Sequence, residues 1–179
     1  MATPPSTLLA VSFQGELGTA QLSTLFAAAE ERGCVVVDAR AGNFANTCSG
    51  SIVLRGAWNH LARFEAVLPA LSEQLGLKFI HERTHLLEDQ AELYPYEVEV
   101  VGPRVEQYVA AFLQFFNQAG CIVHDMNVHS YAADYTSAET VSLQLVVLMP
   151  TKLSPAHLRE HFFELCDNLR ADGVISPLK

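Results

Sequence analysis

The chain of 179 residues is long for one small domain and about right for two domains of roughly 85–90 residues each. Half of its residues are hydrophobic and 17% are charged, which is typical of a packed globular protein and argues against a disordered chain. The formal charge of −9, from 11 Lys and Arg against 20 Asp and Glu, disfavours direct nucleic-acid binding, because that affinity comes from cationic side chains that release counterions from phosphates.

The first half of the chain predicts the element order strand, helix, strand, strand, helix, strand. Apolar residues at positions 22, 25, 26 and 29 have the spacing of one helix face, and Gly33 follows them as a typical helix end. Asn59 is expected to cap a second helix, which Pro69 kinks or divides and Gly76 ends. The strands are expected at Leu8–Phe13, Cys34–Arg40, Ser51–Arg55 and Leu77–Ile80, and the first helix at Thr19–Arg32.

The second half repeats this pattern. A shift of 87 residues gives six identities over the 33 positions 8–40, and it carries the apolar helix face of the first half onto a second one. Further along, a shift of 97 aligns Gly76 with Gly173, so about ten extra residues are expected within Ser130–Glu139, where a strand hairpin lengthens. The elements are expected at Tyr96–Val101, Val105–Ala119, Cys121–Val128 and Val141–Met149, in a helix that Ser154 caps with Pro155 in its first turn, and at Val174–Ser176.

Each copy of the repeat predicts an α+β fold of the βαββαβ type. Right-handed crossovers place both helices on one face of a four-stranded antiparallel sheet and give the strand order 4-1-3-2, the ferredoxin-like arrangement. The expected domains are residues 1–83 and 94–179. Residues 84–93 between them carry Glu88, Asp89 and Glu92 with few strand formers, and are expected to form an exposed acidic linker.

Two patterns in the sequence suggest chemistry, and neither predicts a catalytic site. The segment from His157 to His161 matches the H-x-x-E-H spacing of one zinc-protease class, but that site needs a third protein ligand, and Glu164 is the single Glu in the 18 residues that follow. The helix pattern puts both histidines at the polar border of an apolar face. Cys34 and Cys121 begin predicted strands with no base suggested nearby, so protonated thiols are expected. We therefore predict no catalytic residue, no metal site and no cofactor.

The start of the chain and its apolar runs predict where the protein resides. Residues 1–7 lack a basic region followed by an apolar core, so no signal peptide is expected. No apolar run approaches the ~20 residues that span a membrane. The four cysteines form no C-x-x-C pair and are interpreted as buried thiols. A soluble, cytoplasmic protein is expected.

Four segments are similar to a known bacterial family. They are Gly33–Arg40 (GCVVVDAR), Leu54–Asn59 (LRGAWN), Glu65–Pro69 (EAVLP) and Glu82–Thr84 (ERT). In letters and spacing they resemble the glycine cleavage system transcriptional repressor family, and the resemblance extends from about Leu8 to Ile175. It implies two tandem ACT domains and a cytoplasmic accessory repressor that acts through a LysR-type activator instead of binding DNA alone.

The resemblance also implies a ligand loop between the first strand and the first helix, where ACT domains hold amino acids. The family usually has Gly-x-Asp-Arg-Pro-Gly there, and this chain has Gly15-Glu-Leu-Gly-Thr-Ala20, in which only Gly15 keeps its place. The Asn that usually follows the helix-ending Gly by two residues is replaced by Val35, and in the second copy by Ile122. The candidate ligand-binding residues are therefore Gly15, Glu16, Leu17, Gly18, Thr19 and Val35 in the first copy and Gly102 in the second.

These observations favour a regulatory protein over an enzyme. The resemblance implies a LysR-type transcriptional activator as partner and a small amino acid such as glycine as a candidate effector. An alternative with the same fold is an amino-acid-binding regulator of another operon or enzyme, and a third is a small hydrolase or metal-binding protein that uses Cys or His. The two modules can pair within one chain or across a homodimer, and the sequence leaves both open.

Overall fold

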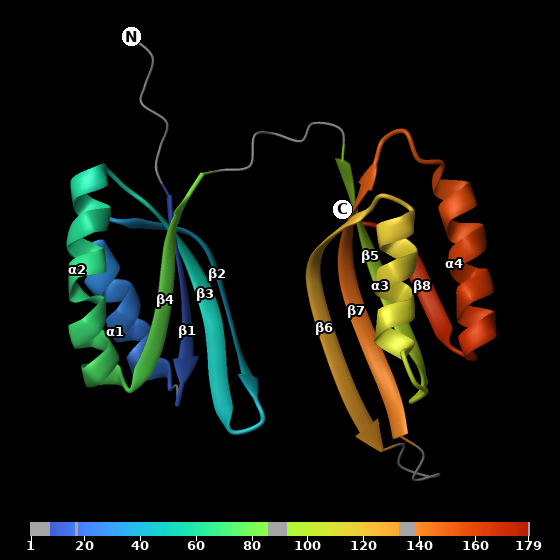
Figure 1. The fold of residues 1–179 in the computed structure, drawn as a ribbon, viewed down its shortest axis with the longest axis horizontal. Helices are drawn as coiled ribbons and strands as arrows, with labels where there is room; N and C mark the ends of the chain where they lie inside the picture. The colour runs from blue at the N-terminus through green and yellow to red at the C-terminus, as the bar shows by residue number, and fades with distance from the viewer. Residues whose placement is uncertain (1–7, 17, 86–92, 133–138, 179) are drawn as a thin grey trace. The chain divides into compact units, whose positions relative to one another are not determined.

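The computed structural model describes residues 8–16, 18–85, 93–132 and 139–178, and the chain divides into two compact units, Met1–Glu88 and Asp89–Lys179 (Figure 1). Each unit has the predicted element order. The first contains β1 (Leu8–Gly15), α1 (Thr19–Glu30), β2 (Val35–Phe44), β3 (Thr47–Arg55), α2 (Trp58–Leu75) and β4 (Leu77–Thr84). The second contains β5 (Leu93–Pro103), α3 (Tyr108–Gln118), β6 (Ile122–Ala132), β7 (Glu139–Pro150), α4 (Pro155–Leu169) and β8 (Asp172–Pro177).

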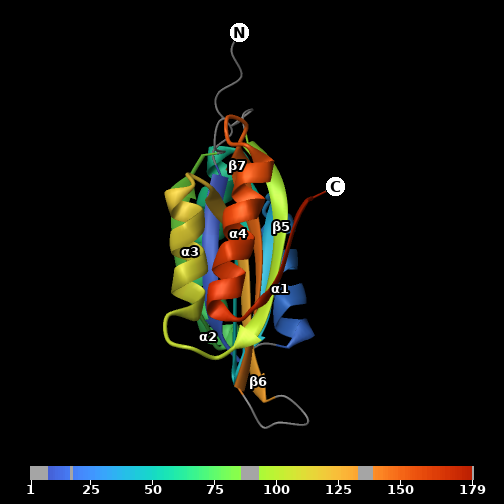
Figure 2. The same cartoon turned by 90° about the vertical axis from the view of Figure 1, so that its right-hand side faces the viewer.

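Both sheets have four antiparallel strands in the orders β2-β3-β1-β4 and β6-β7-β5-β8. This is the predicted order 4-1-3-2 read from the other edge, so the ferredoxin-like fold of both units is confirmed. The two helices of each unit lie on the same face of its sheet, as Figure 1 shows for α1 and α2, and Figure 2 for α3 and α4.

The core of each unit lies between the sheet and its two helices, because the strands alternate apolar and polar residues. In the first unit Val11 and Phe13 of β1 pack in one cluster with Leu25 of α1 and Phe64 of α2. The second core is more aromatic and is built around Phe112, Phe116 and Phe162. Full burial of each such side chain stabilises the fold by about 1.5–3 kcal/mol.

The residues predicted to end or cap the helices agree in part with the structure. Gly33 and Gly76 have φ values of +78° and +66°, in the left-handed region that glycine adopts without strain. Ser154 caps α4 as predicted, with its Oγ 3.5 Å from the amide nitrogen of His157. The prediction that Asn59 caps α2 was wrong, because the helix begins at Trp58 and Ala57 holds the extended cap position.

Three helices differ from the predictions, and of these α1 ends at Glu30 where Arg32 was expected. Helix α2 continues through Pro69 without a break. Helix α3 was expected from Val105 but begins at Tyr108, because Gln107 has a φ of +61° that interrupts helical geometry. Each difference lies at a helix boundary or a local irregularity, where sequence patterns are least informative.

Strand pairing corrects the register of the repeat. Val35 pairs with Arg55, 20 positions later, whereas Ile122 pairs with Leu148, 26 positions later, so the second hairpin has six extra residues and not ten. Because Val11 pairs with His81 and Val98 pairs with Ile175, the last strands are related by a shift of 94 (81 to 175) and not 97. Gly76 therefore corresponds to Arg170, which has a left-handed φ of +55°, and not to Gly173.

The predicted linker 84–93 is shorter than expected at both ends. Thr84 is the last residue of β4, and Leu93 is the first residue of β5. Its acidic residues, Glu88, Asp89 and Glu92, lie outside the described residues.

Candidate functional site

The predicted loop of the first unit joins β1 to α1. Gly15 is the last residue of β1, and a Cβ placed on it would lie 2.4 Å from the carbonyl oxygen of Gly76, so no other residue fits there without displacing the backbone. Glu16 is exposed. Gly18 precedes the helix in extended geometry, and its amide donates to Oε1 of Gln21 at 2.9 Å. The Gly18 amide, which could otherwise donate to the carboxylate of a bound amino acid, therefore already has an internal acceptor. Leu17 lies outside the described residues.

The sheet places Val35 far from this loop within the first unit. Val35 pairs with Arg55, and Arg55 pairs with Leu8 at the start of β1, whereas Gly15 closes the same strand. Seven residues of extended strand separate Leu8 from Gly15, or roughly 23 Å. A small amino acid bound at the loop of one unit is thus out of reach of Val35 in that unit.

The corresponding loop of the second unit is filled by its own side chains. A Cβ on Gly102 would lie 2.8 Å from the hydroxyl oxygen of Tyr108 and 2.9 Å from the Cβ of Ala171. Tyr108 is 3% exposed, and its hydroxyl has no hydrogen-bond partner among the described residues. Burial, with smaller contributions from Cys166 and Asp172, raises the pKa of Tyr108 to about 12.

The second loop is also tied to β7. The amide of Arg104 donates to the carbonyl oxygen of Glu139 at 2.9 Å, and its guanidinium contacts the Glu139 carboxylate at 2.6 Å. Pro103 has no amide hydrogen to offer. Neither Arg104, through its bonded amide, nor Pro103 therefore offers a backbone donor to an amino acid.

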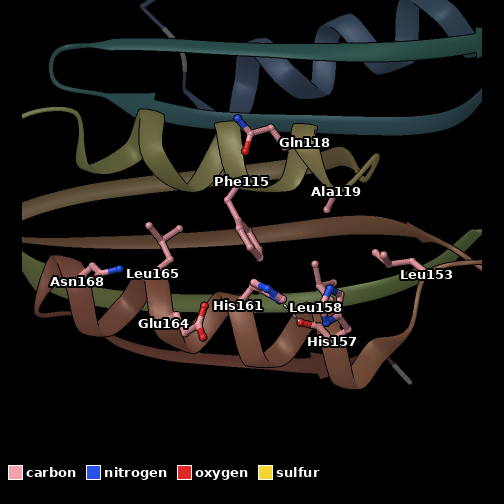
Figure 3. A pocket seen from close by; sticks show the side chains of 10 residues that line it. All are labelled: Phe115, Gln118, Ala119, Leu153, His157, Leu158, His161, Glu164, Leu165 and Asn168. Atoms are coloured by element: carbon pink, nitrogen blue, oxygen red, sulfur yellow. Dashed lines mark hydrogen bonds between the residues drawn. The ribbon is translucent and has the colours of Figure 1, made fainter.

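A cavity of about 510 Å³ lies in the second unit between α3 and α4 (Figure 3). Its floor is apolar, and His157 and His161 lie on its rim with Glu164, so the histidines are at the polar border of α4 as predicted. The ring centroids of the two histidines are 4.1 Å apart. The lining residues are Phe115, Gln118, Ala119, Leu153, His157, Leu158, His161, Glu164, Leu165 and Asn168.

The four cysteines, Cys34, Cys48, Cys121 and Cys166, are buried free thiols, as predicted. Burial raises the pKa of Cys34 and Cys121, and it raises the pKa of Cys166 to about 11. Since the thiolate is the nucleophile, these three groups are poorly suited to covalent catalysis.

The described part of the chain lacks two features that are typical of other classes of protein. Among residues 8–16, 18–85, 93–132 and 139–178, no cluster of three or more His, Cys, Asp or Glu is arranged to hold a metal ion. None of the helices in these ranges is long and apolar enough to cross a membrane.

Comparison with known proteins agrees with the resemblance described from the sequence. Residues 7–81 match the sequence model of the ACT domain. The glycine cleavage system transcriptional repressors of Escherichia coli (strain K12) and Shigella flexneri are each 22% identical to the chain over 144 residues, which cover 80% of this chain and 76% of theirs. Residues 7–81 are therefore similar to the ACT domain, and the chain is similar to this repressor over most of its length.

Solved structures show the same tandem fold. A crystal structure provisionally named as a glycine cleavage system transcriptional repressor matches with a TM-score of 0.76 and 20% identity, over 97% of this chain and 98% of the other. The crystal structure of an unknown protein from Galdieria sulphuraria also has a TM-score of 0.76, with 15% identity over 97% and 99% of the two chains. At these identities the likeness concerns the fold.

Two residues that shape the candidate loops were not identified from the sequence. Gln21 was expected only as part of helix α1, but its side chain accepts the Gly18 amide. Its position in a G-x-x-Q segment at a helix start is the signal that could have indicated this, since a Gln three residues after a cap reaches back to the cap amide. Tyr108 gave no comparable signal, because its burial beside Gly102 depends on the late start of α3.

Proposed function

We propose that this protein is a cytoplasmic regulator that represses transcription by contacting a LysR-type transcriptional activator, and that it has no catalytic activity. The observation that carries the proposal is the similarity to the glycine cleavage system transcriptional repressor over 80% of the chain, together with the same tandem fold. The buried thiols described above and the net charge of −9 support a role in protein contact over covalent catalysis or direct DNA binding.

Sensing of a small amino acid is the second part of the proposal, and it is assigned to the first unit. The loop Gly15–Thr19 has an exposed carboxylate in Glu16 that can meet an ammonium group, and it lies at the start of α1, where the helix dipole favours a carboxylate. The second loop has the Tyr108 ring against Gly102 and a proline where a donor is needed. With the Gly18 amide already bonded and Val35 distant, binding of glycine is expected to be weak.

The test of the partner uses the activator of the glycine cleavage genes from the same organism, bound to its operator DNA. Addition of this protein is expected to supershift the activator–DNA complex or to release the DNA, and the purified activator should co-elute with it in gel filtration. Absence of both effects would contradict the proposal. Co-elution with a metabolic enzyme instead would favour the alternative, an ACT regulator of that enzyme.

A further inference from the structure

We propose that His157 and His161 form a two-imidazole binding site for a divalent transition-metal ion such as Cu²⁺ or Zn²⁺, on the rim of the cavity between α3 and α4. The two residues are four positions apart on α4, so their side chains lie on the same side of the helix about one turn apart. Their ring centroids are 4.1 Å apart (Figure 3). With the ring centroids this close, rotation of the rings can bring one nitrogen of each imidazole to the ~2.0–2.1 Å at which both bond to a shared ion.

The hydrogen bond of His161 leaves one ring nitrogen with a lone pair for a metal ion. Its Nδ1 lies 2.9 Å from the carbonyl oxygen of His157. A carbonyl oxygen can only accept, so Nδ1 carries the hydrogen in the neutral ring and the lone pair is on Nε2. Metal-binding histidines commonly donate their second nitrogen to a carbonyl in this way, which fixes the tautomer and the orientation of the ring.

The surroundings leave room for an ion and for its remaining ligands. Both histidines are exposed, and they line a cavity of about 510 Å³ that can hold the water molecules needed to complete a coordination shell. Glu164 lies on the same rim, one turn after His161, and can approach through a water molecule. The site thus differs from the three-ligand site of a zinc protease, because it holds the ion with two protein ligands.

Two features limit the affinity of this site. The rings meet at 75°, so at least one must turn about its Cβ–Cγ bond, which is a soft torsion. His157 also lies in the first turn of α4, where the helix dipole disfavours a cation. We therefore expect moderate affinity, with Cu²⁺ bound more tightly than Zn²⁺.

The experiment is calorimetric titration of the untagged full-length protein with Cu²⁺ and with Zn²⁺, and with Mg²⁺ as a control ion that prefers oxygen ligands. One equivalent of Cu²⁺ is expected to bind with moderate affinity, and Cu²⁺ electron paramagnetic resonance should show hyperfine coupling to nitrogen. His157→Ala and His161→Ala are each expected to weaken binding at least about tenfold. Loss of a residue that only supports a metal ligand already has an effect of this size, and these variants remove a ligand itself. Acidification should weaken binding as well, because the ligand is the neutral imidazole.

His129→Ala removes an exposed histidine from β6 and serves as the matched control, which should leave the affinity unchanged. The proposal would be overturned by absence of a Cu²⁺ equivalent, by wild-type affinity in the His157→Ala/His161→Ala double variant, or by an equal loss in His129→Ala. His157→Gln and His161→Gln, which keep polar side chains on an exposed helix face, repeat the measurement in case an alanine variant unfolds.

Discussion

Gly15 is the last residue of β1 and Gly102 the next-to-last residue of β5, and the steric reason for glycine differs between the two positions. At Gly15 the neighbouring group is the backbone oxygen of Gly76, which cannot turn away. At Gly102 the neighbours are the Tyr108 hydroxyl and the side chain of Ala171. Glycine at equivalent positions therefore allows the close approach of a backbone carbonyl in one unit and of the Tyr108 side chain in the other.

At the residue scale, this difference predicts how glycine binds. Calorimetric titration of the protein with glycine and with serine should show weak or undetectable binding. Any binding should fall when Glu16→Ala removes the carboxylate that can meet the ammonium group, since an unpaired charged group costs free energy when it is buried. Glu106→Ala removes the acidic residue of the second loop and should have no effect. Tight binding that survives Glu16→Ala would place the effector elsewhere than in this loop.

Helix α2 tolerates a proline that the sequence marks as a break. Pro69 follows eleven helical residues and is exposed, so its ring points away from the core formed by Leu61, Phe64, Leu68 and Leu71. A proline there lacks the amide that would bond to the carbonyl of Glu65. Continuous burial of the apolar face on both sides of Pro69 compensates for that lost bond.

At the scale of the element, Pro69→Ala is expected to stabilise the first unit by about 2 kcal/mol. Alanine is about 3 kcal/mol more favourable than proline within a helix, and the greater freedom of the unfolded chain offsets up to about 1 kcal/mol. Urea-induced unfolding, followed by circular dichroism, measures the change. Pro69→Gly is the matched control and should gain about 1 kcal/mol less than Pro69→Ala. A destabilised Pro69→Ala protein would show that the backbone depends on the proline.

The edge strands share an irregularity that the repeat preserves. The register of β2 against β3 shifts between Val36 and Asp38, and that of β6 against β7 shifts between Val123 and Asp125, at positions related by the same 87-residue shift. Such a bulge twists an edge strand, and Asp125 further accepts the amide of Met126 at 2.9 Å. The identical Asp residues of the two copies thus mark a structural feature of the edge.

At the scale of the whole molecule, the distribution of charge bears on the affinity of the protein for DNA. Residues 1–88 contain 6 Lys and Arg against 8 Asp and Glu, and residues 89–179 contain 5 against 12, so neither half is basic. Non-specific affinity for DNA requires cations that displace counterions from the phosphates. In the proposed function, the protein partner and not this chain recognises the operator.

The purified protein alone is expected to leave operator DNA unshifted in a mobility-shift assay at physiological salt. Specific DNA-binding proteins usually bind with dissociation constants of about 10⁻⁸–10⁻¹¹ M under such conditions. The activator alone, on the same DNA, provides the positive control. A sequence-specific shift by this protein at sub-micromolar concentration would contradict the accessory role.

The sequence by itself determined the tandem repeat and the order of the elements in each copy. The alternation of residues such as Val11 and Phe13 in β1, and the helix face that includes Leu25, are set by short-range periodicities of 2 and 3.6 residues, which any element must satisfy to bury one face. Gly33 and Gly76 marked helix ends because the left-handed backbone there favours glycine. Strand order followed from the handedness of the crossovers.

Only the tertiary structure decided the register of the repeat and the character of the loops. Strand pairing showed that Gly76 of the first copy is equivalent to Arg170 of the second. Strands pair through backbone groups, so identical residues in the two copies need not occupy equivalent positions. Strand pairing sets the distance between Val35 and Gly15, and side-chain packing brings the Tyr108 hydroxyl close to Gly102. Such distances are fixed by packing in three dimensions, and neither composition nor spacing along the chain specifies them.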